Sequence, residues 1–414
     1  MKKVLIINAG SKQLPMVRWA KKKGYFVLVA DSRKNMLCFP EADKVLPIAP
    51  FEREELIEAA VREGIDAVCY TTSENPIPVV RAIADRLGLP HALPDKAAQA
   101  SCSKIAMRDI FAEAGINDIP FARVRSLQEV EAFGREAGFP LVLKLTGSGN
   151  QIGMFILSSP EEFAMRREEV GRAVAGAEYL AERLYEGTEV NAIGLYVGGR
   201  LVRHTVSDRL HYGPAHNFVV YEHRYPSTEP RAVQNRVRDK LEATGRALDV
   251  VNGILFVQYI VSEGEPRTIE LGARVPGGMM WQLFRWATGV DLMETWLDMF
   301  VKRDFSITDV TERDSYGGVS IRFLSGPPGP LPAGRLLGVD GMAAARGLDG
   351  VRYADFYNKF KQVEPPKAVP TLRDGSDRFF CCITTGDTYE AALVLNHKAE
   401  TMLRFVVEAD NTGA

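Results

Sequence analysis

The stretch Val257-Gln258-Tyr259-Ile260-Val261-Ser262-Glu263-Gly264-Glu265-Pro266-Arg267-Thr268-Ile269-Glu270-Leu271-Gly272-Ala273-Arg274 has the pattern of two strands joined by a turn. Its β-branched and aromatic runs flank a polar Ser-Glu-Gly-Glu-Pro segment, which predicts a hairpin. Side chains alternate between faces along a strand, so Gln258 and Glu270 can meet across the pair, with Arg274 close by. Oxygen ligands beside a guanidinium suit Mg²⁺ and a transferred phosphate. A polar strand edge with an ordinary surface salt bridge is the alternative.

Length and composition limit the possible classes of protein. The chain has 414 residues, of which 46% are hydrophobic and 25% charged, with a net charge of −2. This length exceeds what one hydrophobic core usually serves, so two to four lobes are expected. The near-neutral charge gives no electrostatic case for nucleic acid or a membrane surface as a partner.

Cysteine usage and the apolar runs bear on location. The five cysteines form no CxxC pair and are odd in number, which favours reduced thiols in the cytoplasm. The apolar run near the start is too short for a signal peptide and is expected to form a first strand. No run of about 18 apolar residues occurs, so no membrane span is expected.

The first 95 or so residues alternate strands and helices. The expected strands cover residues 4–7, 26–30 and 67–70, and the expected helices cover 14–23, 54–63 and 77–87. This rhythm predicts a parallel sheet with ligands near the carboxyl ends of its strands. The first turn lacks the second and third glycines of GxGxxG, which argues against a dinucleotide site. Residues 71–74 either face a cleft or cap the next helix.

A different pattern begins at Ser103. Lys104 is expected to start an amphipathic helix to about residue 114, and a second helix is expected over 127–138. A strand ending in Lys144 then leads into a Gly/Ser-rich loop at 146–154, which offers backbone N–H donors and a cation to phosphates. It is not a Walker loop, because the lysine precedes the glycines. A loose hairpin turn is the alternative.

The middle of the chain contains four of the six histidines. Strands are expected over 179–184, 190–197 and 201–207, followed by a polar, aromatic segment at 211–227. The histidine spacing is not that of a zinc site and no cysteine is near, so a mobile substrate loop is the preferred interpretation. Pro276-Gly277-Gly278 is expected to form a tight turn that either admits a ligand closely or serves only as a turn. Helices are then expected over 280–300, interrupted near Gly289, and over 389–405.

These pieces together resemble the ATP-grasp superfamily, over about residues 1–300. Lys104 and its helix are similar to the family's first phosphate-binding lysine, and the strand at 139–144 is similar to that of the second, Lys144. The glycine-rich loop resembles the family's phosphate lid, and residues 182–189 resemble its adenine hinge. The resemblance implies ATP and Mg²⁺ as cofactors. The implied nucleotide-binding residues are Lys104, Lys144, Gly147, Ser148, Gly149, Glu182, Arg183, Leu184, Tyr185 and Glu189.

The resemblance also implies the fold class, which is α/β. It comprises an N-terminal Rossmann-like pre-ATP-grasp domain at 1–98 and central ATP-grasp lobes at 99–308, with a small lobe at about 118–187. A C-terminal α+β domain follows at 309–414. Segments around Asp208, His223 and Arg274 are similar to bacterial L-amino-acid ligases. A homodimer in the cytoplasm is expected.

The implied reaction activates a carboxylate, that of an amino acid, as an acylphosphate and joins it to an amine, with release of ADP and phosphate. Arg274, Lys144 and Glu270 are the implied catalytic residues, and Gln258 and Glu270 the implied Mg²⁺ ligands. Either His216 or His223 is proposed to take the amine proton. The implied substrate-binding residues are Glu74, Asp208, Arg209, His216, His223, Arg274, Gly277 and Gly278.

Two departures from the family pattern keep alternatives open. Gln258 replaces the usual first Mg²⁺ carboxylate, as in carbamoyl-phosphate-synthase-like members, and Gly272 replaces an asparagine found in many members. A neutral amide binds Mg²⁺ less tightly than a carboxylate. The alternatives are a carbamoyl-phosphate-synthase-like or purine-biosynthesis-like ligase, and a catalytically silent ATP-binding regulatory protein.

Overall fold

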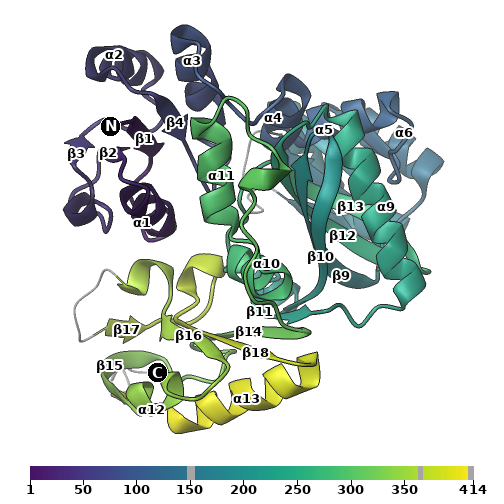
Figure 1. Cartoon of the computed structure of the whole chain (residues 1–414). Helices are drawn as coiled ribbons and strands as arrows, with labels where there is room; N and C mark the ends of the chain where they lie inside the picture. The colour runs from purple at the N-terminus through teal and green to yellow at the C-terminus, as the bar shows by residue number, and fades with distance from the viewer. Residues whose placement is uncertain (147–153, 362–366, 409–414) are drawn as a thin grey trace.

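The computed structural model describes residues 1–146, 154–361 and 367–408. The N-terminal region and the C-terminal region both lie against a larger central body (Figure 1). Within the described residues, no helix combines the length and the apolar character that crossing a membrane requires.

The N-terminal region is a parallel sheet with helices packed on it, as its sequence pattern predicts. The strand order is β3-β2-β1-β4, and every pairing is parallel. Helices α2 and α3 each end at a glycine in the left-handed conformation, Gly64 and Gly88, where a Cβ would be strained. The elements are β1 (Lys3–Ile7), α1 (Leu14–Lys22), β2 (Phe26–Ala30), β3 (Lys44–Leu46), α2 (Arg53–Glu63), β4 (Ala67–Cys69) and α3 (Ile77–Leu87).

Two helices lead from this region into a small lobe. The lobe is an antiparallel sheet of order β5-β8-β6-β7, with its own hydrophobic core against the helices that follow. Ser103 begins helix α5 by accepting a hydrogen bond from the backbone N–H of Ala106, a normal N-cap. The elements are α4 (Asp95–Cys102), α5 (Lys104–Glu113), β5 (Phe121–Val124), α6 (Leu127–Ala137), β6 (Leu141–Leu145), β7 (Phe155–Leu157), α7 (Pro160–Met165), α8 (Arg167–Gly176) and β8 (Tyr179–Arg183).

The central body and part of the C-terminal region share one eight-stranded antiparallel sheet of order β13-β12-β9-β10-β11-β14-β18-β16. Because β11 pairs with β14, the sheet continues across the expected domain boundary at residue 308. The strands are β9 (Thr188–Val197), β10 (Arg200–His211), β11 (Val220–Tyr225), β12 (Gly253–Ser262), β13 (Glu265–Gly272), β14 (Gly318–Leu324), β16 (Val351–Phe356) and β18 (Phe380–Gly386).

The remaining elements pack around these sheets. The expected interruption near Gly289 is confirmed, since two helices flank it. The helices are α9 (Arg231–Ala247), α10 (Met280–Thr288), α11 (Leu292–Val301), α12 (Met342–Arg346) and α13 (Tyr389–Met402). A separate three-stranded sheet in the C-terminal region has the order β17-β15-β19, with β15 (Gly334–Asp340), β17 (Lys367–Val369) and β19 (Arg404–Glu408).

Two sequence-based predictions are wrong. The segment at 211–227 is not one long irregular loop, because β11 occupies its second half, held between β10 and β14 by hydrogen bonds to both. The expected helix over 389–405 ends at Met402, and the chain then enters β19. In both places pairing with strands distant in sequence decides the conformation, and local composition does not reveal such pairing.

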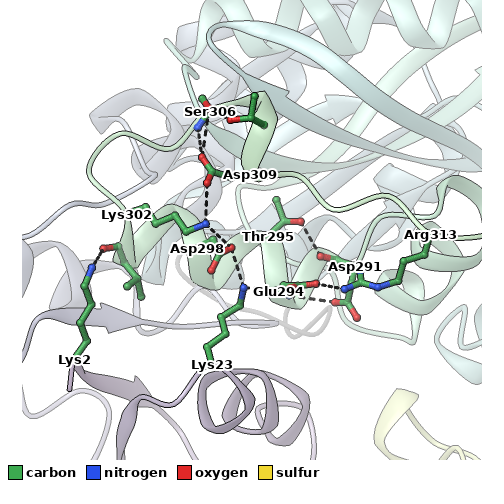
Figure 2. A network of polar contacts seen from close by, with 12 residues as sticks. Lys2, Lys23, Asp291, Glu294, Thr295, Asp298, Lys302, Ser306, Asp309 and Arg313 are labelled. Atoms are coloured by element: carbon green, nitrogen blue, oxygen red, sulfur yellow. Dashed lines mark hydrogen bonds and ion pairs between the residues drawn. The ribbon is translucent and has the colours of Figure 1, made fainter.

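An ion-pair network docks the N-terminal region on helix α11 (Figure 2). The Lys23 ammonium lies 3.1 Å from carboxylate oxygens of both Glu294 and Asp298, and Lys302 approaches Asp298 at 3.2 Å. Asp298 is only 2% exposed, so these pairs lie in an environment that screens charge less than water does. Lys2 also donates to the Val301 carbonyl, so the network joins the amino ends of β1 and β2 to α11.

Candidate active site

The hairpin of β12 and β13 brings Gln258 directly opposite Glu270. This register confirms the predicted hairpin. Both side chains line a cavity of about 790 Å³ between the small lobe and the large sheet. Lys104, at the start of α5, donates a hydrogen bond to Oε1 of Glu270 over 3.0 Å. Enclosure by protein would raise the pKa of Glu270, but Lys104, Lys144 and Arg274 outweigh it and lower that pKa.

A buried charge cluster forms one wall of this cavity. Lys144 on β6 and Arg108 on α5 both form ion pairs with Glu182 on β8, and Glu182 is 2% exposed. Arg108 also donates to the Thr268 carbonyl on β13 over 2.7 Å. Burial opposes ionisation of Glu182, yet Lys144 and Arg108 hold its pKa at about 2. The carboxylate is therefore ionised, and Arg108 connects the small lobe with the large sheet.

Arg274 forms an ion pair with Glu74, which lies 200 positions earlier in the chain. Two hydrogen bonds join the ends of β4 and β13 here: Tyr70 Oη donates to the Ala273 carbonyl over 2.9 Å, and the Thr72 N–H donates to the Val275 carbonyl over 3.2 Å. Helix α3 has no side-chain cap at its start, so the alternative that residues 71–74 cap it is wrong. Glu74 instead lines the cavity.

The chain from β8 to β9 forms the far wall. Arg183, Leu184 and Tyr185 line the cavity, and the Leu184 N–H donates to the Pro140 carbonyl over 2.9 Å. The Arg267 guanidinium lies 3.9 Å from the centre of the Tyr185 ring, which fixes the ring by a cation–π contact. This wall offers an apolar slot bordered by backbone polar groups.

A second ion-pair group lines the cavity near β9 and β10. Glu189 contacts Arg209 and lies 3.2 Å from Nε2 of His211. The hydrogen bond from His211, with Arg209 beside it, overcomes the effect of burial and lowers the pKa of Glu189. The same hydrogen bond to Glu189 raises the pKa of His211. Glu189 is thus an anionic acceptor, and Arg209 a cation, inside the cavity.

Several residues predicted to bind substrate lie elsewhere. The Asp208 carboxylate is 3% exposed and accepts hydrogen bonds from Ser227 and Thr228, so it has internal partners and does not line the cavity. His216 stacks against Tyr212 outside the cavity. Burial holds the pKa of His223 well below its usual value, and the nearby charges of Arg209 and Arg378 lower it further. His223 is therefore a poor proton acceptor.

The other predicted residues fall into two groups. Gly277 and Gly278 line a second cavity of about 400 Å³, between α1, α10 and the C-terminal region. Gly147, Ser148 and Gly149 lie outside the described residues.

Three residues of the site region had not been singled out from sequence. Arg108 lies one helical turn after Lys104, and this i, i+4 spacing was the available signal. Lys12 and Arg378 lie near Arg274 and Gly278, and only tertiary contacts reveal them.

The first cavity can bind a polyanion together with a divalent cation. Lys104, Lys144, Arg209 and Arg274 supply positive charge, and Glu270 and Gln258 supply neighbouring oxygens. Among the described residues, no group of three or more His, Cys, Asp or Glu side chains forms a metal site. A cation would therefore need oxygens from the bound polyanion as well.

Known proteins resemble the chain in sequence and in fold. No family model matches it. It is 27% identical to a D-alanine–D-alanine ligase of Geobacter sulfurreducens over 51% of this chain and 67% of the ligase. It is 26% identical to an alanine–anticapsin ligase of Bacillus subtilis over 67% of this chain but 63% of that relative, which is less than two thirds.

Two solved structures superpose along nearly the whole chain. A phosphoribosylglycinamide synthetase from Anaerococcus prevotii has a TM-score of 0.82 at 17% identity, covering 98% of this chain and 100% of that one. An L-amino acid ligase from Bacillus licheniformis has a TM-score of 0.78 at 19% identity, covering 99% of each. At these identities the likeness shows a shared fold.

Proposed function

We propose that this chain, which belongs to the ATP-grasp superfamily, is an ATP-dependent carboxylate–amine ligase. It activates a carboxylate, preferably that of an amino acid, as an acylphosphate and joins it to an amine, releasing ADP and phosphate. The observation that carries this proposal is the opposition of Gln258 and Glu270 across the β12–β13 hairpin, with Arg274, Lys104 and Lys144 directed at the same cavity.

The chain's own residues divide the work of phosphoryl transfer. Lys104 and Lys144 neutralise the phosphates of ATP, and the segment at 183–185 receives the adenine. Glu189 accepts hydrogen bonds from the ribose. Phosphoryl transfer depends mainly on positioning and on charge neutralisation, which this set of residues suits.

Mg²⁺ would be held by Glu270 and Gln258, and when bound it supplies charge neutralisation for the transferred phosphoryl group. Glu270 is ionised because the surrounding cations lower its pKa, which fits it to a cation. Gln258 adds a neutral oxygen, so one firmly held ion suits this pair better than two.

Arg274 holds the transferred group and then stabilises the negative oxygen of the tetrahedral adduct. Its side chain is 14% exposed, so its charge is screened less than that of a surface arginine. Glu74 fixes the guanidinium from the N-terminal region. The amine's proton acceptor is not assigned to His223, because its pKa is depressed.

The direct test is ADP release with Mg²⁺–ATP across a matrix of amino acids, offered singly and in pairs. Release that requires two substrates, with a peptide or amide product found by mass spectrometry, supports the ligase. The Arg274→Ala variant, purified in parallel, controls for contaminating ATPases. If every pair is silent although ATP binds, the proposal fails for amino acids.

A second candidate is a ligase for bicarbonate or a ribonucleotide amine. Gln258 at the metal position favours it, as does the structural likeness to phosphoribosylglycinamide synthetase. ADP release that depends on bicarbonate or on a ribonucleotide would identify this branch. ATP binding without turnover on any substrate would favour a regulatory role instead.

The assembly and the location are part of the same proposal. We infer a cytoplasmic homodimer with small-molecule substrates, with domains at 1–98, 99–308 and 309–414. All five cysteines are free thiols, which suits a reducing compartment. Light scattering of the purified chain tests the dimer, and a monomer at micromolar concentration would refute it.

A further inference from the structure

The second cavity has a marked excess of positive charge. Four of its lining side chains are cationic (Lys12, Arg18, Lys22 and Lys361), and Asp291 is its one carboxylate among the described residues. Asp291 is already occupied, because it caps helix α11 and accepts a hydrogen bond from the Trp19 indole. An anion that enters this cavity would therefore meet several cations and no unpaired carboxylate among the described residues.

Three of these cations have partners, but Lys12 has none among the described residues. Arg18 pairs with Glu41, Lys361 lies 3.7 Å from Asp355, and Lys22 stacks on the Trp19 ring. No carboxylate of the described chain lies within ion-pair distance of Lys12. The Lys12 side chain lines the second cavity, so it stays accessible to solvent although protein surrounds it.

Arg378 provides a second cation without a carboxylate partner among the described residues. Its guanidinium lies against the Phe323 and Tyr357 rings, at 4.2 and 5.1 Å from their centres, and its Nε donates to the Gly375 carbonyl. A Cβ built on Gly278 would stand 3.9 Å from its Nη1, so Arg378 lies just behind the glycine turn that lines the cavity.

Both cations lie beside Gly278, which follows Arg274 by four residues: Lys12 lines the same cavity as Gly278, and Arg378 lies behind it. Enclosure by protein lowers the pKa of Lys12, and the nearby charges of Arg378 and Arg274 lower it further. Glu74 is the acid at this junction, and it is paired with Arg274. Among the described residues both cations lack a carboxylate partner and both reach solvent, so they are available to bind an anion.

The surrounding frame holds this junction in place. Lys12 lies two residues before the start of helix α1, and the network around Lys23 and Asp298 docks that helix on α11 (Figure 2). The opposite wall carries Tyr353 and Tyr357 of the C-terminal region. Lys12 thus comes from one end of the chain and Arg378 from the other, and both positions are set by packing.

We propose that this junction binds a second anionic group, a carboxylate or a phosphate, on a substrate whose reacting end lies at Arg274. Lys12 and Arg378 are its ligands. The inference rests on the proposed ligase function, which makes the carboxylate at Arg274 the reacting end. With the second anionic group, the substrate carries two negative groups. A substrate with a neutral side chain would leave both cations without a partner.

Binding is tested first, without turnover. The full chain is saturated with Mg²⁺ and a non-hydrolysable ATP analogue, so that the nucleotide cavity is filled, and glutarate or inorganic phosphate is titrated calorimetrically. At least one of them should bind, and Lys12→Met should weaken it about tenfold or more, because hydrogen bonds between charged groups are the stronger kind. Lys398→Met, on an exposed face of α13, removes the same charge and should leave binding unchanged.

Whichever anion binds more tightly identifies the chemistry of the group. If neither anion binds, or if Lys12→Met binds as well as the unmodified chain, the proposal is overturned. Arg378→Met is a second variant, and circular dichroism should confirm its fold because Arg378 also packs on two rings.

Turnover is tested with matched substrate pairs: aspartate with asparagine, glutamate with glutamine, and phosphoserine with serine. The anionic member should give kcat/KM at least about tenfold higher in ADP release, and Lys12→Met should abolish that preference. A preference for the neutral members would refute the anionic subsite while leaving the ligase intact. If no substrate gives ADP release, the result counts against the ligase. The calorimetric titration then decides by itself whether the anionic subsite exists.

Discussion

Replacing Arg108 by methionine tests the charge cluster that joins the two lobes. The pKa of Glu182 stands at about 2 against an ordinary 4.5, and this difference corresponds to about 3 kcal/mol of stabilisation from Lys144 and Arg108 together. Removing one partner from a buried ion pair commonly costs about 3–5 kcal/mol. Because Lys144 remains, we expect Arg108→Met to lower the free energy of unfolding by about 2–4 kcal/mol at pH 7.

The assay is urea unfolding followed by fluorescence, with Arg123→Met as the matched control. Arg123 pairs with Asp109, but both side chains are exposed, at 51% and 38%, so its loss should cost less than about 0.5 kcal/mol. The pKa of Glu182 is depressed, so its contribution is present above pH 4.5 and is lost as the pH falls toward 2. The difference in the free energy of unfolding between Arg108→Met and the unmodified chain should therefore become smaller as the pH falls through that range. An Arg108→Met variant within 1 kcal/mol of the unmodified chain at pH 7 would refute the reasoning.

Three further predictions concern single residues. Arg274→Ala should reduce kcat for ADP release by about 10²- to 10³-fold, while the affinity for ATP, measured by fluorescence titration, changes little. An equal loss of ATP affinity would show that Arg274 binds ATP in the ground state and does not act on the transition state. His211→Gln should lower the melting temperature below pH 6.5, and the deficit should vanish as the pH rises through the raised pKa of His211; a deficit independent of pH would exclude the ion pair with Glu189. Gly187→Ala should destabilise the chain by about 2–3 kcal/mol in thermal unfolding, because its Cβ would stand 1.9 Å from a carbonyl oxygen of β12. In the control Gly176→Ala, the new Cβ would have no atom within 4 Å, so the change should be neutral or slightly stabilising.

Local patterns in the sequence predicted much of the framework. The alternating strands and helices at the start, the helix that begins at Lys104 and the β12–β13 hairpin all follow from short-range spacing and turn chemistry. The opposition of Gln258 and Glu270 needs more than the turn, because the register shifts by one residue between Gln258 and Tyr259.

The tertiary structure alone decided which distant charges meet. Arg274 could equally have faced solvent, but β4 and β13 end side by side and Glu74 pairs with it. Asp208 and Arg209 are neighbours in sequence, yet the alternation of β10 directs one to Ser227 and the other into the first cavity.

The extent of the large sheet was equally hidden from the sequence. Strand β11 exists because β10 and β14 lie on either side of it, and that pairing carries the sheet into the C-terminal region. Lys12 and Arg378, 366 positions apart by their residue numbers, both lie beside the Gly278 turn because the whole chain packs that way. Periodicity reports which face of an element is buried, but the partner that covers the face depends on how the whole chain packs.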